Sequence, residues 1–241
     1  MKKYIFIHGA CQGGWVWYKI EDLLKSNNID YEIPDLPGHG NDKTPLFEIT
    51  LEKYVESIRE IINKTDKEIV LVAHSMGGFI ASQVAELEYK RIEKIIYIAS
   101  LIPKNNETIS GMLQMDKTSK LMQGSAFSED KKFVELNLNR INEVLYNNCS
   151  NEDIEFGRSK ICKQALLPFI TPIKLSKNFE NIPKYYIKTL YDNSVSIEFQ
   201  NEICKRYNGV ITKEIKSGHA PFFSNYLELY DIIFNDNWEK V

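Results

Sequence analysis

The chain lacks the residue patterns that build metal sites, disulfide frameworks or nucleic-acid-binding surfaces. Four cysteines occur among 241 residues, far apart and without a Cys-x-x-Cys pair. This spacing predicts neither a zinc site nor a disulfide framework, and it suits a reducing cytosol. Lysine and arginine total 30 against 33 aspartates and glutamates, for a net charge of −3. The chain therefore offers no basic field that would attract nucleic acid or anionic lipid.

Long apolar runs are missing as well. No stretch approaches the roughly 18 apolar residues that a membrane-spanning helix requires. The N-terminal Met-Lys-Lys precedes an apolar run, but that run ends at His8, too soon for a secretory signal. We therefore expect a cytoplasmic protein without a membrane partner. No internal repeat or linker-like stretch divides the sequence, so its length predicts a single domain overall.

Short β-branched stretches alternate with segments of helical periodicity along most of the chain. This alternation predicts an α/β protein, with a mostly parallel sheet that helices cover on both faces. The expected strands are residues 4–7, 31–33, 69–73, 94–100, 185–190 and 211–215. The expected helices are residues 15–27, 51–64, 76–88, 196–207 and 222–236. Thr50 is a suitable N-cap for the second of these helices.

Residues 101–183 interrupt this alternation. They contain many apolar residues but no convincing strand, and we interpret them as a mainly helical cap inserted into a core of residues 1–100 and 184–241. The alternative is that they are ordinary packing helices. Methionines suit an adaptable pocket wall, so the cap is expected to set substrate size. The side chains expected to matter are Met112, Met115, Leu121 and Met122.

The most informative stretch is Ala73-His74-Ser75-Met76-Gly77-Gly78, which joins a predicted strand to a predicted helix. A serine hydroxyl is a poor nucleophile until a base activates it, and small residues on both sides permit a sharp turn that exposes it. The helix directs its free N–H groups to the same place. Ser75 is therefore the candidate nucleophile, although Ala73 stands where the usual pattern has glycine.

Four histidines are available as the base. His8 and His39 lie at strand–loop junctions and His74 lies inside the turn, whereas His219 follows the last predicted strand. Ligands of open α/β sheets bind where the carboxyl ends of the strands meet. His219 is therefore the best candidate base, and the alternative is an ordinary loop histidine.

The orienting acid is expected between the serine and the histidine, in a loop after a strand. Asp192 fits this position, and the alternative is that it only forms a turn beside Asn193. Asp116, Asp130 and Asp153 lie in the inserted segment and fit poorly.

An oxyanion hole requires two backbone N–H donors. Met76, directly after Ser75, is expected to supply one of them at the helix N-terminus. Ala10 is expected to supply the other, from the loop after the first strand, because Gly9 permits a close approach of the backbone. The alternative for that loop is a simple strand-exit turn.

Three stretches together indicate a family: residues 8–17 (HGACQGGWVW), 35–40 (DLPGHG) and 73–78 (AHSMGG). They resemble the α/β-hydrolase branch that contains plant methylesterases, hydroxynitrile lyases and bacterial carboxylesterases. Residues 186–192 and 197–200 and the pair Gly218-His219 are also similar. The resemblance implies the α/β-hydrolase fold, a Ser75–His219–Asp192 triad, Ala10 and Met76 as oxyanion donors, small and fairly apolar ester substrates, and no cofactor or metal.

The chain departs from this family at two further positions. A histidine is usual where Gln12 stands, and a basic residue is common where Asn193 stands. Neither change removes a triad member. The expected function is a serine esterase that cleaves small carboxylic esters, methyl esters among them, through an acyl-enzyme intermediate.

Two alternatives stay open at this point: a hydroxynitrile lyase-type reaction on the same triad, and a ligand receptor that turns over slowly. Lyases of the family use a lysine after the catalytic histidine and a threonine near the oxyanion site. Here those positions hold Ala220 and Gly9, which favours the esterase. The sequence does not decide between a monomer and a homodimer.

Overall fold

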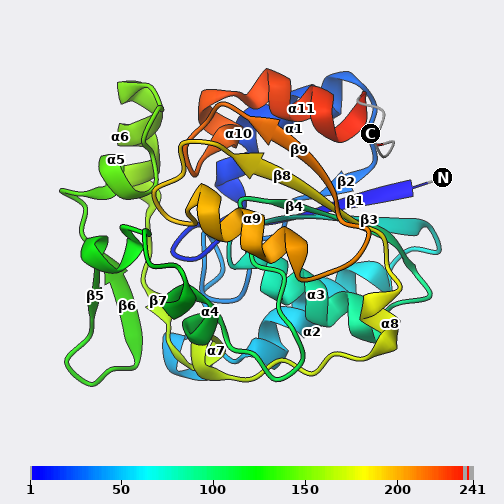
Figure 1. Cartoon of the computed structure of the whole chain (residues 1–241), viewed down its shortest axis with the longest axis horizontal. Coiled ribbons are helices and arrows are strands. Elements are labelled where there is room, and N and C mark those ends of the chain that lie inside the picture. The colour runs from blue at the N-terminus through cyan, green and yellow to red at the C-terminus, as the bar shows by residue number, and fades with distance from the viewer. Residues whose placement is uncertain (1, 236–237, 239–241) are drawn as a thin grey trace.

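A six-stranded sheet with the strand order β2-β1-β3-β4-β8-β9 forms the centre of the protein (Figure 1). The computed structural model describes residues 2–235 and 238. All neighbouring strands of this sheet run parallel, as predicted. The strands are β1 (Lys2–Ile7), β2 (Tyr31–Glu32), β3 (Glu68–His74), β4 (Ile92–Ile98), β8 (Lys184–Thr189) and β9 (Ile211–Ile215).

Helices cover both faces of the sheet because successive strand side chains point to opposite sides. Ile5 and Ile7 belong to a buried cluster with α2 (Leu51–Ile62), α3 (Gly77–Leu87) and α9 (Ile197–Lys205). Phe6, between them, belongs to a second cluster with α1 (Tyr18–Ser26), α10 (Pro221–Ser224) and α11 (Tyr226–Phe234). The double covering explains why the central strand β3 is buried from Ile69 to His74.

The predicted strands and helices of the core are present with somewhat different bounds: β4, for example, is Ile92–Ile98 rather than residues 94–100. The side chain of Thr50 accepts a hydrogen bond from Lys53 N, which confirms the predicted N-cap of α2. The first predicted helix begins instead as a 3₁₀ turn, η1 (Gly14–Trp17). The last one is two helices, because Asn225 adopts a non-helical backbone (φ −135°, ψ 38°) between them. Residue 236 of that prediction lies outside the described residues.

Residues 101–183 lie between β4 and β8 and contain six short helices. Figure 1 shows the segment that carries α4–α7 beside the sheet, on the side to which the arrowhead of β8 points. The helices are α4 (Ile109–Met115), η3 (Leu121–Gly124), α5 (Ile141–Val144), α6 (Asn151–Lys160), α7 (Leu167–Ile170) and α8 (Lys177–Glu180). Among the described residues, no helix has the length and hydropathy of a membrane span.

The inserted segment also contains strands, so the expectation of none was wrong. A three-stranded antiparallel sheet joins β5 (Ser125–Phe127), β6 (Phe133–Leu136) and β7 (Gln164–Ala165). Each strand has four residues or fewer. Such stretches are too short for a period of two to stand out, and β7 pairs with residues about thirty positions earlier in the chain.

Candidate active site

Ser75 occupies the tight turn between β3 and α3. Its φ is +53°, in the left-handed region that residues other than glycine rarely adopt. The backbone oxygen of Ser75 accepts hydrogen bonds from Gly78 N (3.1 Å), Leu101 N (3.3 Å) and the hydroxyl of Ser100 (2.6 Å). These contacts hold the turn in its strained conformation, as is common where a side chain must be presented for chemistry.

Two glycines let the loop after β1 pack directly against this turn. A Cβ atom on Gly9 would lie 3.0 Å from Cβ of Ser75, and one on Gly77 would lie 2.7 Å from the backbone oxygens of Ile7 and His8. The second distance is shorter than real Cβ contacts allow, and a Cβ atom on Gly9 would also lie 2.9 Å from Nδ1 of His74. Glycine is therefore required at positions 9 and 77 for this close approach.

The close approach brings together the two predicted oxyanion donors. Ala10 follows Gly9, and Met76 lies between Ser75 and the first residue of α3. Within residues 2–235 and 238, neither backbone N–H donates a hydrogen bond to another residue. Two free N–H groups on adjacent loops, one at a helix N-terminus, can bind an oxyanion.

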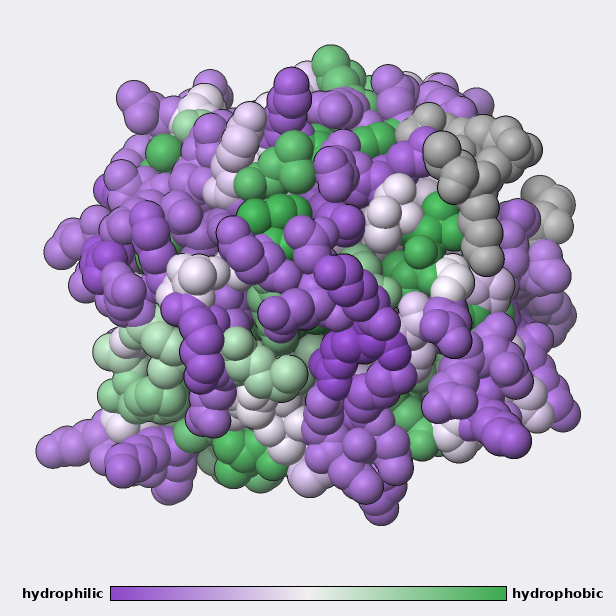
Figure 2. All heavy atoms as spheres, in the orientation of Figure 1, coloured by the Kyte–Doolittle hydropathy of each residue, from purple (hydrophilic) through white to green (hydrophobic). Residues whose placement is uncertain are grey.

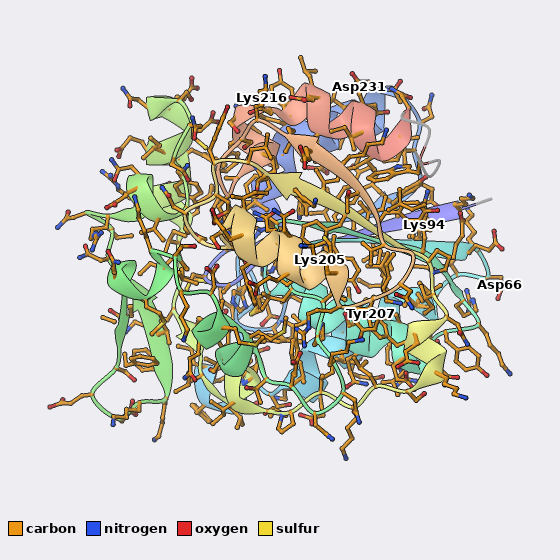
Figure 3. The ribbon with its side chains drawn as sticks, in the orientation of Figure 1. Asp66, Lys94, Lys205, Tyr207, Lys216 and Asp231 are labelled. Atoms are coloured by element: carbon orange, nitrogen blue, oxygen red, sulfur yellow. The ribbon has the colours of Figure 1, made fainter. Side chains whose placement is uncertain are left out.

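Asp192 and His219 come together although 27 positions separate them in the chain. Nδ1 of His219 lies 2.8 Å from Oδ2 of Asp192, and both side chains are almost fully buried. An ionised carboxylate only accepts hydrogen bonds, so Nδ1 carries the proton of the neutral ring. Nε2 is then free to accept a proton. Lys216, labelled in Figure 3, lies at the beginning of the loop that leads from β9 to His219.

The Asp192 carboxylate is held by both of its oxygens. Oδ1 accepts the backbone N–H groups of Ser194 (2.7 Å) and Val195 (2.9 Å). Oδ2 accepts the hydroxyl of Thr189 (2.8 Å) in addition to His219, and Nε2 of Gln200 lies at 3.5 Å. The sequence did not predict roles for Thr189 and Gln200. Five donors around one carboxylate fix its orientation.

His74 links the serine turn to the loop of His219. Its Nε2 lies 2.8 Å from the backbone oxygen of His219, and the two ring centroids are 4.5 Å apart. His219 therefore lies beside the residue that precedes Ser75. Burial, together with the neighbouring His219, holds the pKa of His74 well below its usual range. The ring is neutral, which excludes it as a charged partner of Asp192.

His8 and His39 contact neighbouring loops rather than Asp192. The ring of His8 lies between the backbone oxygen of Gly9 (2.8 Å) and the N–H of Leu36 (3.1 Å). Burial, with a smaller effect of nearby His39, lowers the pKa of His8 to about 3. His39 is buried, which lowers its pKa, and its Nε2 lies 3.0 Å from Oε1 of Gln164.

The other aspartates that could have been the acid lie elsewhere. Asp116 accepts hydrogen bonds from Ser196, at the beginning of α9. Asp130 is in the β5–β6 hairpin and pairs with Lys132. Asp153 pairs with Lys19. Asp192 is thus the aspartate that contacts His219. No group of three or more potential metal ligands occurs in the described part of the chain.

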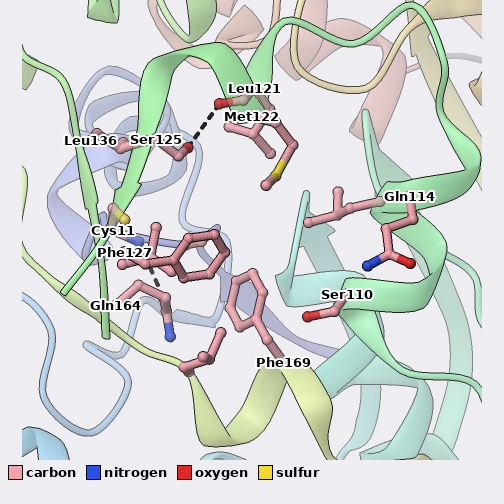
Figure 4. Close-up of a pocket in the computed structure, with 14 residues that line it drawn as sticks. Cys11, Ser110, Gln114, Leu121, Met122, Ser125, Phe127, Leu136, Gln164 and Phe169 are labelled. Carbon is pink, nitrogen blue, oxygen red and sulfur yellow. Dashed lines mark hydrogen bonds between the residues drawn. The ribbon is translucent and has the colours of Figure 1, made fainter. Parts of the chain in front are cut away.

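A cavity with an apolar lining adjoins the loop of Ala10. It encloses about 650 Å³, counting space open to solvent, between α4, α7, η3 and the small sheet (Figure 4). Hydrophobic residues gather on the surface in the lower left of Figure 2, where Figure 1 places these elements. The lining consists of Ala10, Cys11, Ser110, Leu113, Gln114, Leu121, Met122, Ser125, Phe127, Val134, Leu136, Gln164, Leu166 and Phe169.

Two of the four side chains expected in the pocket wall are there. Leu121 and Met122 line the cavity. Met112 is buried in the main core instead, and Met115 is 46% exposed on the outside of α4. The periodicity of a helical sequence shows which apolar residues share a face of the helix, but not which neighbouring element that face contacts.

One polar residue of the cavity, Gln164, supports the loop after β1. Its Oε1 accepts the N–H of Cys11 (3.3 Å), the residue after Ala10, and its Nε2 donates to the hydroxyl of Tyr54 (3.0 Å). Cys11 also has a positive φ of 60°. Nothing in the local sequence around Gln164 indicates this role, because its partners lie more than 100 residues earlier.

Comparisons with known proteins agree with this architecture. The model of the Alpha/beta hydrolase family matches residues 4–232. Methylesterase 7 of Arabidopsis thaliana is 27% identical over 245 residues, which cover 95% of this chain and 93% of the relative. Among solved structures, a pyrethroid hydrolase from Sphingobium faniae JZ-2 has a TM-score of 0.89 at 23% identity, covering 97% of this chain and 96% of that one.

Polyneuridine aldehyde esterase also has a TM-score of 0.89, at 24% identity and with 98% of both chains covered. These structures have the same fold along their whole length, including the inserted segment. The family model spans nearly all of the sequence, and the parallel sheet and the serine turn match the fold that the resemblance implied. The chain belongs to the α/β-hydrolase family.

Proposed function

We propose that this protein is a serine hydrolase that cleaves small, fairly apolar carboxylic esters, methyl esters among them. The observation that carries the proposal is the 2.8 Å contact between His219 and Asp192, beside a serine held at positive φ. The methylesterase relatives support an ester substrate. The apolar cavity beside Ala10 supports an apolar acyl group.

In this mechanism Ser75 attacks the ester carbonyl while Nε2 of His219 takes its proton. Asp192 keeps the proton of the neutral ring on Nδ1 and stabilises the imidazolium that forms. The N–H groups of Ala10 and Met76 bind the oxyanion of the tetrahedral intermediate. His219 then protonates the departing alcohol. In the second half, water attacks the acyl-enzyme and His219 again accepts the proton.

The lyase alternative is not favoured. Departure of a cyanide anion into a partly desolvated pocket requires a nearby cation. Ala220 follows His219, is 1% exposed and carries no charge. Gly9 has no hydroxyl to contact the substrate oxygen, and a threonine there would collide with Ser75 and His74.

Cytoplasmic location is part of this proposal. All four cysteines are free, which suits a reducing compartment.

The test is a panel of p-nitrophenyl and methyl esters of increasing acyl length, with wild type and Ser75→Ala. Ser75→Ala should lower kcat by roughly 10³–10⁶ while ligand binding survives. A fluorophosphonate probe should label Ser75. Ser110→Ala, which changes a serine of the cavity lining, should label as wild type does. Stoichiometric labelling of another serine, or turnover unchanged in Ser75→Ala, would overturn the proposal.

A further inference from the structure

The loop that holds Asp192 is attached to the inserted segment from two sides. On one side, the hydroxyl of Ser119 donates to the backbone oxygen of Ser194 (2.7 Å), and Lys120 N donates to the oxygen of Asn193 (2.7 Å). These residues lie between α4 and η3. The next two residues, 121 and 122, line the cavity. The same stretch of chain therefore lines the cavity and is hydrogen-bonded to the loop that carries Asp192 (residues 191–196, called the acid loop below).

The second attachment comes from α5. Nδ2 of Asn193 donates to the backbone oxygen of Glu143 (2.8 Å), and the hydroxyl of Ser194 donates to that of Val144 (2.6 Å). Ser194 is 1% exposed. Residues 193 and 194 are thus hydrogen-bonded to the inserted segment by both their side chains and their backbone oxygens.

Further contacts secure the ends of the same loop. Nδ2 of Asn147 donates to the backbone oxygen of Tyr191 (2.6 Å), immediately before the acid. Asp116 accepts the N–H (2.8 Å) and the hydroxyl (2.6 Å) of Ser196, immediately before α9. Buried hydrogen bonds to a charged carboxylate are among the stronger ones in proteins. The insertion therefore holds residues 191, 193, 194 and 196, while the central domain holds the same loop through Tyr191 N to the oxygen of Ser217 (2.9 Å) and Gln200 Nε2 to the oxygen of Val195 (2.7 Å).

The position of the acid loop decides where the carboxylate of Asp192 points. Oδ1 is fixed by the N–H groups of Ser194 and Val195, which move with the loop. Only Oδ2 is fixed by the central domain, through Thr189 and His219. A shift of residues 193–194 would turn the carboxylate about its own axis and lengthen the bond to His219.

We propose that Ser119, Asn193 and Ser194 are positioning residues for the catalytic acid, so that the inserted segment aligns the triad as well as forming the pocket. The inference rests on the proposed function, in which Asp192 orients His219. It gives Asn193 a role of its own: the asparagine that replaces the basic residue common in the family is, with Ser194, one of two side chains that tie the loop of Asp192 to α5.

The experiment compares Ser119→Ala and Asn193→Ala with a matched control. Gln83→Ala also removes hydrogen bonds between the core and the inserted segment, since Gln83 exchanges two 3.0 Å bonds with the backbone of Lys174. That tie does not involve the acid loop. Ser119→Thr keeps the hydroxyl and serves as the rescue variant. The readouts are kcat and KM for one p-nitrophenyl ester, the pH–rate profile, and the melting temperature.

Ser119→Ala and Asn193→Ala should each lower kcat about 5- to 20-fold, with KM within about twofold of wild type. A misaligned acid reduces the stabilisation of the transition state but leaves substrate binding unchanged. The acid limb of the profile should move to lower pH, because a displaced Asp192 stabilises the imidazolium less. Ser119→Thr should restore kcat, and Gln83→Ala should match wild type in kcat and profile.

Two results would overturn the inference. In one, Ser119→Ala and Asn193→Ala have the kcat and pH profile of Gln83→Ala. In the other, kcat falls only in proportion to melting temperature in all three variants. In either case a large loss in Ser75→Ala and Asp192→Asn would leave the proposed function standing. Wild-type activity in Asp192→Asn would instead refute the proposed function itself.

Discussion

Nε2 of His74 lies 2.8 Å from the backbone oxygen of His219, and this contact joins the serine turn to the loop of the base. The backbone oxygen can only accept, so His74 donates from Nε2. Its pKa is lowered well below the usual range by burial and by the neighbouring His219. The serine turn and the loop of His219 are thus joined by a buried, uncharged histidine.

Stability should therefore fall as the pH drops below about 6.5. Burial lowers the pKa of His8, to about 3, and those of His39 and His74. Below 6.5 the unfolded chain binds protons that the native state does not, so the free energy of unfolding decreases. Each histidine contributes up to about 1.4 kcal/mol per pH unit, and for His8 the loss continues to about pH 3.

Urea unfolding at several pH values between 5 and 8 measures this effect before most carboxylates titrate. The free energy of unfolding should be nearly level from pH 8 to 7 and decrease from 6.5 to 5. A flat profile over that whole range would show that these histidines accept protons in the native state.

The functional motifs could be predicted from the sequence because their chemistry is local. The turn around Ser75 lies within six consecutive residues, and the loops of Asp192 and His219 each follow a recognisable strand. Chain order and strand ends then place the three residues at one edge of the sheet. The positions of Ala10 and Met76, the proposed oxyanion donors, follow from two loops that glycines allow to pack together.

The inserted segment could not be predicted in the same way. Its strands have two to four residues, and their pairing depends on contacts distant in sequence. Met112 and Met115 lie on the same short helix as cavity residue Leu113, yet one is in the core and the other is in solvent. Most of the hydrogen bonds that tie this segment to the loop of Asp192 are accepted by backbone oxygens, which any residue type supplies.

Substitution of Gly9 should damage catalysis more than folding. The methyl group of Gly9→Ala would lie 3.0 Å from Cβ of Ser75 and 2.9 Å from Nδ1 of His74, so the turn or the loop has to shift. A displacement of this size misplaces the oxyanion donor at Ala10, and kcat should fall roughly 10²-fold. Steady-state kinetics and circular dichroism of the variant check this expectation.

Gly111→Ala is the matched control, since its Cβ would contact only Thr108 Oγ1 at 3.0 Å and it lies in α4. It should retain the kcat of wild type. Full activity in Gly9→Ala would show that the loop accommodates a Cβ atom at position 9 without displacing Ala10, and would contradict the prediction. The same collision predicts that Gly9→Thr with Ala220→Lys loses esterase activity and does not cleave mandelonitrile above the buffer rate.

Gln164 should matter for both stability and turnover. Gln164→Leu leaves the N–H of Cys11 and the ring of His39 without their buried partner. An unpaired buried donor costs roughly 1–3 kcal/mol, and the loop that carries Ala10 loses its support. Thermal melting and kcat should therefore both decrease. Gln83→Leu removes a glutamine bonded to exposed backbone and should change the free energy of unfolding by less than about 1 kcal/mol.

The cavity should determine acyl-chain preference, and Met122 offers the clearest test. Its side chain lines the cavity yet is 52% exposed, so truncation removes contact with the substrate at little expense of core packing. Met122→Ala should lower kcat/KM for a hexanoyl or octanoyl p-nitrophenyl ester about 3- to 10-fold relative to the acetyl ester, because each buried methylene contributes about 0.8 kcal/mol.

Met115→Ala is the matched control. It removes a methionine of similar exposure, 46%, that does not line the cavity, and it should leave the ratio of long to short esters unchanged. An equal change of that ratio in both variants, or in neither, would place the acyl chain outside this cavity.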